Sequence, residues 1–298
     1  MAEWTTRSLL TWTTQDFRAL GIPTARLDAE LLLAHALRVD RVRLYMDMDR
    51  PLSPDELAAM RALVVRRRKR EPVAYLLGQR EFYRRAFVVN QAVLVPRPDT
   101  ETLIERALVL LPTERAAQVL DLCTGSGAIA VTLAAERPQA RVVATDVSPE
   151  ALAVARTNAE KHGVDARVEL RLGDLFQALE PGTRYDLIVA NPPYVRSGDL
   201  AELAAELHHE PALALIAGDD GLSVLTRLCH EVSAWLMPTG ALLFEVGAGQ
   251  APTVLQLLAA EPGLTSLQAH TDLGGIERIV EAHGPEPMPE PAPPVTTE

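Results

Sequence analysis

The chain has 298 residues, of which 48% are hydrophobic, and a formal net charge of −11. This length allows one large core and a smaller accessory core, so we expect two domains. No apolar run is long enough to span a bilayer and the first residues lack the order of a signal peptide, so we expect no membrane association and a cytoplasmic location.

Cysteine usage and charge distribution narrow the class of protein further. The two cysteines, Cys123 and Cys229, cannot form a disulfide framework, and the His208-His209 pair lacks metal-ligand spacing. We therefore predict no metal and no disulfide. Residues 1–95 hold 16 Lys and Arg against 11 Asp and Glu, whereas the rest of the chain is strongly acidic. That charge argues against direct binding of nucleic acid by the larger part.

The first 78 residues are predicted to form a small helical domain. A broad apolar stripe runs through residues 25–37, and Ser53 followed by Pro54 is typical of a helix N-terminus. The basic run Arg66–Arg70 could meet RNA or an acidic protein, but cations at the end of a helix also interact favourably with its dipole. We favour the second interpretation.

A hairpin and then an alternation of strands and helices follow. Residues 79–98 are predicted as a hairpin linker, and residues 99–283 as a doubly wound α/β domain with a seven-stranded, Rossmann-like sheet. The expected strands are 117–122, 141–146, 167–172, 185–190, 240–247, 265–271 and 276–282. The link 272–275 is too short for a crossover, so the last two strands should be antiparallel neighbours.

A glycine-rich turn after the first of these strands predicts a nucleotide site. Gly125 and Gly127 permit positive φ and close approach of a ligand, and the following helix start offers free N–H groups. Asp146 ends the next strand, where a ribose-binding carboxylate belongs. The turn alone fits NAD as well as S-adenosylmethionine, and Asp146 could instead be a helix N-terminal carboxylate.

The segment Asn191-Pro192-Pro193-Tyr194, directly after an apolar strand, favours methyl transfer. Two prolines hold the backbone rigid, so the Asn191 side-chain oxygen and the Pro192 carbonyl can accept hydrogens from a planar NH₂ group, with Tyr194 stacked over it. A strand-terminating turn is the alternative interpretation. Because orientation of the nitrogen supplies much of the rate, a dedicated strong base is not expected.

With these motifs, the chain resembles the peptide chain release factor N5-glutamine methyltransferases over residues 1–283. Further segments that carry the resemblance are residues 71–78, Glu81-Phe82, 95–101 and 210–215. The resemblance implies a five-helix amino-terminal domain joined by a hairpin to a seven-stranded, S-adenosylmethionine-dependent domain. It implies methylation of the glutamine in the Gly-Gly-Gln loop of release factors. Because the amino-terminal domain is basic and has no nucleotide or nucleophile motif, we expect it to recognise the protein substrate. Separately, we expect a monomer.

The resemblance also carries site residues onto this chain. Cofactor binding is expected at Cys123, Thr124, Gly125, Ser126, Gly127, Asp146, Asp174, Leu175 and Asn191. Binding of the substrate glutamine is expected at Asn191, Pro192, Pro193 and Tyr194, with catalysis assigned to Asn191, Pro192 and Tyr194. Cys123 stands where glycine is frequent and Leu175 where an aromatic residue is frequent, so the cofactor environment should differ somewhat. Arg97 and Glu101 could contact ligand or fix the domain junction by ion pairing.

Three other functions remain compatible with parts of the sequence. A ribosomal-protein glutamine methyltransferase is the nearest alternative, and residues 96–101 favour the release-factor branch. A DNA adenine-N6 methyltransferase would use the same loop but needs a basic groove, whereas residues 191–210 are acidic. A non-catalytic sensor of an adenosine ligand would not need Asn191. The Pro-rich residues 284–298 should form a disordered tail.

Overall fold

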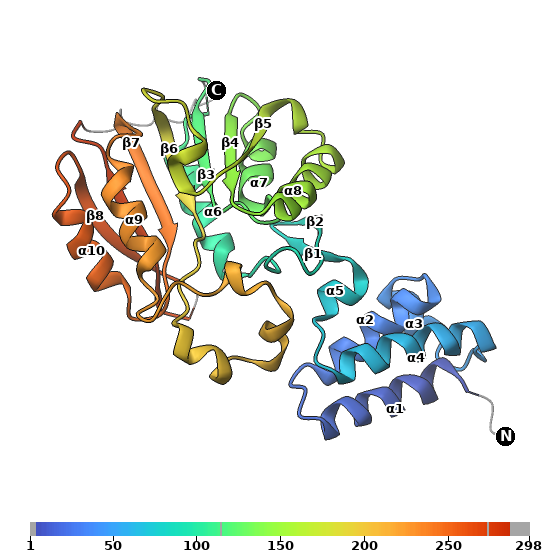
Figure 1. Cartoon of the computed structure of the whole chain (residues 1–298). Helices are drawn as coiled ribbons and strands as arrows, with labels where there is room; N and C mark the ends of the chain where they lie inside the picture. The colour runs from blue at the N-terminus through green and yellow to red at the C-terminus, as the bar shows by residue number, and fades with distance from the viewer. Residues whose placement is uncertain (1–3, 114, 273, 287–298) are drawn as a thin grey trace, which may run out of the picture. The chain divides into compact units, whose positions relative to one another are not determined.

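The computed structural model describes residues 4–113, 115–272 and 274–286, which divide into two compact units (Figure 1). The first comprises the described residues up to Gln79 together with Ala204–His209; the second comprises Arg80–Leu203 and the described residues from Glu210 onward. A short segment of the acidic half of the chain therefore belongs to the helical unit. Within the described residues, none of the helices has the length and apolar character that crossing a membrane requires.

Five helices form the first unit, as the resemblance implied. They are α1 (Thr6–Ala19), α2 (Ala25–Leu37), α3 (Arg41–Met46), α4 (Pro54–Arg68) and α5 (Val73–Leu77). Their core contains Leu10, Phe17, Leu33 and Met60, all almost fully buried. Ser53 caps α4 as predicted, because its hydroxyl accepts from the Glu56 amide while the Glu56 carboxylate accepts from the Ser53 amide.

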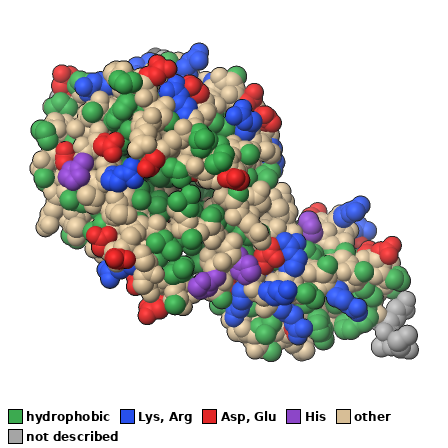
Figure 2. All heavy atoms as spheres, viewed as in Figure 1, with side chains coloured by type: hydrophobic (Ala, Val, Ile, Leu, Met, Phe, Trp, Pro, Cys, Tyr) green, Lys and Arg blue, Asp and Glu red, His purple; other side chains and the backbone are tan. Residues whose placement is uncertain are grey.

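The basic run at the end of α4 is largely paired within this unit. Arg66 contacts Glu71, Arg67 contacts Asp28 and Glu206, Arg68 contacts Asp16, and Arg70 also contacts Glu206. The ring of His209 lies 2.7 Å from the Lys69 carbonyl oxygen. These contacts tie residues 204–209 to α4. Arginines that are already paired with carboxylates are less available to bind a polyanion. Lys and Arg side chains nevertheless gather on the visible face of this unit (Figure 2).

The hairpin is built from β1 (Gln79–Phe82) and β2 (Arg85–Val88), and all its residues after Gln79 belong to the second unit. Tyr83 and Arg84 form its turn with positive φ values of 45° and 60°. Two consecutive residues in this region are typical of the tight turns that match strand twist. Phe82 and Phe87 meet edge to face in the core beneath it.

The predicted seven-stranded sheet is confirmed in the second unit (Figure 1). In spatial order its strands are β5 (Val168–Leu172), β4 (Arg141–Asp146), β3 (Gln118–Leu122), β6 (Tyr185–Ala190), β7 (Leu236–Glu245), β9 (Glu277–His283) and β8 (Thr265–Thr271). The first five are parallel, and β9 is antiparallel to both neighbours, as the short link predicted.

Helices cover both faces of this sheet. The core on one face includes residues of α6 (Asp99–Leu110), α7 (Ala128–Glu136) and α8 (Pro149–Lys161). The core on the other includes residues of α9 (Ser223–Val232) and α10 (Ala251–Ala259). Successive side chains of β3 point to opposite faces of the sheet, so Val119 packs in the first core and Leu120 in the second. The carboxyl ends of the parallel strands remain free to form a site.

Most expected strand limits lie within one residue of the observed ones, but the limits of β7 and the start of the tail differ more. Strand β7 begins at Leu236, not at residue 240, because its pairing with β6 resumes across a register shift that accommodates Pro238 and Gly240. The predicted disordered tail begins at Gly284, yet the amides of Gly284 and Glu286 donate to the carbonyls of Gly240 and Pro238. The rest of that tail lies outside the described residues.

Candidate functional site

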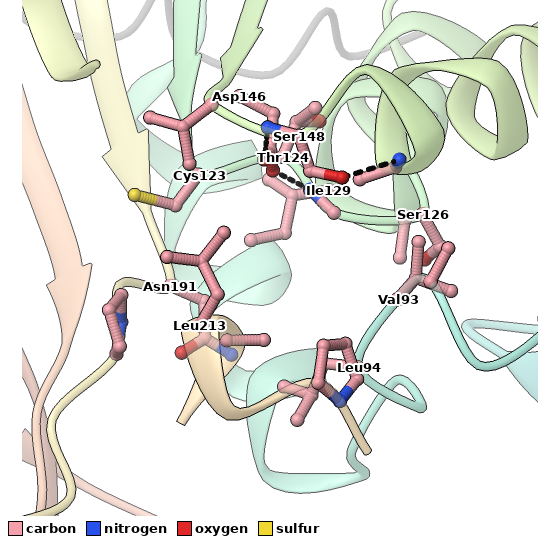
Figure 3. Close-up of a pocket in the computed structure, with 18 of the residues that line it drawn as sticks. Val93, Leu94, Cys123, Thr124, Ser126, Ile129, Asp146, Ser148, Asn191 and Leu213 are labelled. Carbon is pink, nitrogen blue, oxygen red and sulfur yellow. Dashed lines mark hydrogen bonds between the residues drawn. The ribbon is translucent and has the colours of Figure 1, made fainter. Parts of the chain in front are cut away.

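A cavity of about 280 Å³ opens at the carboxyl ends of β3, β4 and β6, and all its lining residues belong to the second unit. Figure 3 shows Cys123, Thr124, Asp146 and Ser148 on one side of it and Asn191, Leu213 and Leu94 on the other. The glycine turn and the Asn191 loop therefore meet in one cavity. This is the place where open α/β sheets bind ligands.

The glycine turn beside the cavity has three residues with positive φ angles. They are 58° at Cys123, 55° at Gly125 and 76° at Gly127. A Cβ added at Gly125 would meet no atom within 4 Å, so the space beside this residue is open to a ligand. A Cβ at Gly127 would lie 3.1 Å from the Ala155 side chain. Gly127 therefore permits packing of α7 against α8, and it does not line the cavity.

Asp146 fixes the turn from the neighbouring strand. Its Oδ2 accepts from the Gly125 amide at 2.8 Å and its Oδ1 from the Ser148 amide at 2.9 Å. Burial raises the pKa of Asp146, while these backbone donors lower it. The carboxylate thus lines the cavity and orders two loops at the same time.

The wall after β5 is formed by Asp174 and Leu175. Leu175 is buried at a positive φ of 48°, and its carbonyl accepts from the Thr145 hydroxyl at 3.2 Å. Asp174 pairs with Arg227 of α9 at 2.8 Å. The sequence did not point to Arg227, which also lines the cavity.

Asn191 is held by a chain of hydrogen bonds that sequence motifs did not predict. Its Nδ2 donates to Thr100 Oγ1 at 3.2 Å, and the Thr100 hydroxyl donates to Glu245 Oε2 at 2.6 Å. The Tyr194 hydroxyl donates to the other carboxylate oxygen at 2.9 Å. Burial raises the pKa of Glu245 and that of Tyr194.

The backbone at Tyr194 is held from a third direction. Gln250 Nε2 donates to the carbonyls of Tyr194 and Gly221, and its Oε1 accepts from the Gly247 amide. A Cβ added at Gly221 would lie 2.5 Å from the Tyr194 carbonyl oxygen. Only glycine therefore allows this close approach. The end of the Asn191–Tyr194 segment is fixed before any ligand binds.

Glu210 holds the segment that contains Val95 and Arg97, which forms another part of the cavity wall. Its buried carboxylate accepts from the Val95 amide at 3.0 Å and from the Arg97 guanidinium at 2.5 Å. The Glu101 carboxylate accepts from the Tyr83 amide at 3.0 Å. Glu101 thus fixes local backbone, whereas Arg97 pairs with the Glu210 carboxylate and lines the cavity.

Most of the predicted site residues come together in this cavity. Nine of them line it: Cys123, Thr124, Gly125, Ser126, Asp146, Asp174, Leu175, Asn191 and Pro193. Gly127, Pro192 and Tyr194 do not, and the Tyr194 hydroxyl points to Glu245. Lining residues that no site motif identified include Phe82, Val93, Leu94, Thr100, Ile129, Val147, Leu213 and Arg227. An acidic residue within the apolar run 241–246 was the available signal for Glu245.

The cavity suits an adenosine ligand with a short charged chain. The space beside Gly125 is open, and the Asp146 carboxylate next to it suits hydroxyl groups. Apolar side chains such as Ile129, Val147 and Leu175 offer flat surface for a base. The residues present therefore fit S-adenosylmethionine.

Comparisons with known proteins agree with this geometry. The PrmC N-terminal domain family model matches residues 8–78, and the Methyltransferase small domain model matches residues 100–243. The release factor glutamine methyltransferase of Geobacter sulfurreducens is 47% identical over 93% of this chain and 96% of its own length. That of Cereibacter sphaeroides is 46% identical over 90% of this chain and 94% of its own length.

A solved structure gives the same fold assignment. The methyltransferase domain described as delta-N METTL16 aligns with a TM-score of 0.50 at 19% identity, over 67% of this chain and 88% of that one. At this identity the likeness concerns the fold alone.

Proposed function

We propose a function from one premise: the chain belongs to the family of release factor glutamine methyltransferases. It is an S-adenosylmethionine-dependent methyltransferase that modifies a glutamine of peptide chain release factors. The resemblance inferred from the sequence is thereby confirmed. The finer assignment, to N5 of the glutamine in a Gly-Gly-Gln loop, is part of the proposal.

The observation that carries the site assignment is the fixed Asn191 amide beside the glycine turn, in one cavity. When bound, S-adenosylmethionine supplies a methyl group on a positively charged sulfur. Asn191 Oδ1 and the Pro192 carbonyl accept the two hydrogens of the substrate amide and aim its lone pair into the cavity. The substrate nitrogen would gain the methyl group as the methyl–sulfur bond breaks, which leaves neutral S-adenosylhomocysteine, and would lose one hydrogen as a proton to water.

The electrostatic contribution of Asn191 grows during this reaction. An amide nitrogen is a weak nucleophile, because its lone pair is delocalised into the carbonyl. As positive charge develops on it, the hydrogen bonds to the Asn191 and Pro192 oxygens become stronger than they were in the ground state. Asp146, Gly125 and Leu175 are assigned to cofactor binding. Gly127 and Tyr194 are assigned to shaping the site.

The direct test is methylation of a purified release factor with isotope-labelled S-adenosylmethionine, followed by peptide sequencing. We expect one methyl group on the glutamine of the Gly-Gly-Gln loop. Asn191→Ala should lower kcat by on the order of a hundredfold with a smaller effect on substrate KM. Methylation of ribosomal proteins instead would transfer the assignment to the nearest alternative. An unchanged rate in Asn191→Ala would remove the acceptor role.

We also propose that the helical unit binds the release factor. Apolar side chains on α3 are exposed to solvent, with Val42 at 69% and Met46 at 70%. Asp at either position should raise KM for a whole release factor and leave a short Gly-Gly-Gln peptide unaffected. Val109→Asp, on α6 of the second unit at 70% exposure, is the matched control. Equal losses on both substrates would contradict a docking role.

The remaining assignments follow from charge and composition. We propose that the protein acts without nucleic acid, because the net charge of −11 opposes binding to a polyanion. We also propose that it acts in the cytoplasm and as a monomer. Sedimentation at micromolar concentration should show one species of the mass of a single chain. An RNA-dependent increase in mass would contradict this.

A further inference from the structure

Four side chains of the second unit form one continuous polar chain behind the cavity. Asn191 at the end of β6 donates to Thr100 of α6, and both Thr100 and Tyr194 donate to Glu245 at the end of β7. Thr100 is 4% exposed and Glu245 is 3% exposed. Bulk water therefore does not reach Thr100 or Glu245 to replace their partners.

The chemistry of these groups gives the chain a direction. The Thr100 hydroxyl donates to Glu245 Oε2 at 2.6 Å, so its single hydrogen is used toward the carboxyl group. The Thr100 oxygen can then only accept from Asn191. The Asn191 side chain must turn its NH₂ group toward Thr100, which leaves Oδ1 for a ligand. The reversed amide would set two acceptor oxygens against each other.

We propose that Thr100 and Glu245 are positioning residues that fix which end of the Asn191 amide faces the substrate nitrogen. The inference rests on the proposed function, because only a substrate NH₂ needs an acceptor there. An asparagine free to reverse would present its own NH₂ group to the substrate for part of the time. That orientation cannot bind the substrate hydrogens and repels the charge developing on nitrogen.

The surroundings of Glu245 are consistent with a directional role. Burial raises the pKa of this carboxyl and Asp99 adds to the effect, whereas the hydroxyl donors Thr100 and Tyr194 and the charge of Arg278 lower it. A buried carboxylate is rarely a net source of stability, since its desolvation offsets its hydrogen bonds. Its two hydroxyl donors both converge on the Asn191–Tyr194 segment. Orientation of that segment is what the carboxylate supplies.

The first test compares Thr100→Val with Thr100→Ser and with Thr132→Val in the full chain. Thr132 of α7 is also fully buried, but its hydroxyl has no hydrogen-bond partner among the described residues. We expect Thr100→Val to lower kcat on the order of tenfold while the Kd for S-adenosylhomocysteine and the substrate KM stay within about twofold. Thr100→Ser should restore kcat, and Thr132→Val should leave it unchanged.

The second test observes the amide directly and does not depend on activity. In ¹⁵N spectra, with the Asn191 side-chain signals assigned through Asn191→Ala, we expect slow hydrogen exchange in the wild-type chain. Thr100→Val and Glu245→Gln should accelerate that exchange, because Glu245→Gln can donate to Thr100 and release the threonine hydrogen toward Asn191 Oδ1. Thr132→Val should not.

The outcomes separate the two proposals. A wild-type protein that fails to methylate release factors would overturn the proposed function. The exchange measurement would still decide in which direction the hydrogen bonds from Asn191 to Glu245 run. Equal kcat in Thr100→Val and Thr132→Val would overturn the inference. So would a loss of kcat in Thr100→Val with unchanged Asn191 exchange, or a loss that Thr100→Ser does not restore.

Discussion

The Gly125 amide donates to Asp146 Oδ2 at 2.8 Å, so the cofactor turn after β3 is locked to the end of β4. Asp146 therefore has two separable tasks. It offers a carboxylate to the cavity, and it orders the Gly125 and Ser148 amides that define the cavity wall.

Asp146→Ala should weaken binding of S-adenosylmethionine by on the order of 1.5–3 kcal/mol, because a charge-assisted contact and a preformed turn are both lost. Isothermal calorimetry measures this directly. Asp186→Ala is a matched control, since the Asp186 carboxylate accepts from the Gln118 amide at 2.7 Å but does not line the cavity. Equal affinity losses in both variants would show a general effect of destabilisation.

Much of this fold was predictable because the governing signals are local. Strand β6 was predicted with its observed limits, since an apolar run ends there at Asn191. The antiparallel pair β8 and β9 followed from the short link 272–275. The meeting of Gly125, Asp146 and Asn191 followed from the rule that parallel strands end at one edge.

The features that were not predicted depend on pairs distant in sequence. Glu245 lies 145 residues from Thr100, and no spacing rule links a threonine at a helix start to an acid at a strand end. Glu206 looked like part of an acidic loop, but it pairs with Arg67, 139 residues earlier. Gly127 matched a ligand-binding fingerprint, yet its missing side chain makes room for Ala155.

The Arg67 cluster predicts a large loss of stability in the helical unit. Arg67 is 3% exposed and bridges Asp28 and Glu206, so Arg67→Ala leaves the buried Asp28 carboxylate without its ion-pair partner and Glu206 with Arg70 alone. We expect the free energy of unfolding to fall by about 3–5 kcal/mol. Arg61→Ala, at an exposed position of the same helix, should change it by less than about 0.5 kcal/mol.

The tryptophans make this measurement specific to one unit. Trp4 and Trp12 belong to the helical unit, whereas Trp235 belongs to the second. In a Trp235→Phe background, the change of fluorescence in urea reports the helical unit alone. If Arg67→Ala and Arg61→Ala unfold at the same urea concentration, the buried pairs contribute no net stability.

Both cysteine thiols should react slowly in the native protein. Burial raises the pKa of Cys229 to about 12. Burial and the neighbouring Asp146 carboxylate raise the pKa of Cys123 above its ordinary value. At pH 8 we expect alkylation at least about a hundredfold slower than for an unfolded thiol, measured by mass spectrometry.

Unfolding in urea is the control, and both cysteines should then react at the ordinary rate. Because Cys123 lines the cavity and Cys229 does not, S-adenosylhomocysteine should slow the residual reaction only at Cys123. Fast labelling of Cys123 in the folded chain would contradict the raised pKa of its thiol. Protection of both sites to the same extent would argue against a cofactor in contact with Cys123.

Asp121 on β3 predicts an unusual dependence of stability on pH. Its Oδ2 accepts from the Thr124 hydroxyl and the Ala130 amide, while its Oδ1 has no partner among the described residues. Full burial raises the pKa of Asp121 to about 7, against about 3.9 in an unfolded chain. Between these values the folded state holds a proton that the unfolded state has released.

The sign of the effect follows from that proton. Stability due to this group falls as pH rises from about 4 to about 7, and the loss, on the order of a few kcal/mol, is complete above the folded pKa. Asp121→Asn stays neutral at every pH and keeps an acceptor for Thr124. Its unfolding free energy in urea, relative to the wild-type chain, should therefore increase with pH across this window and level off above it. Groups with lowered pKa values, such as Glu71 and Glu281, contribute equally to both proteins. Their contributions therefore cancel when the wild-type curve of unfolding free energy against pH is subtracted from that of the variant. A constant difference from pH 4 to pH 8 would mean that Asp121 is ionised in the folded protein throughout.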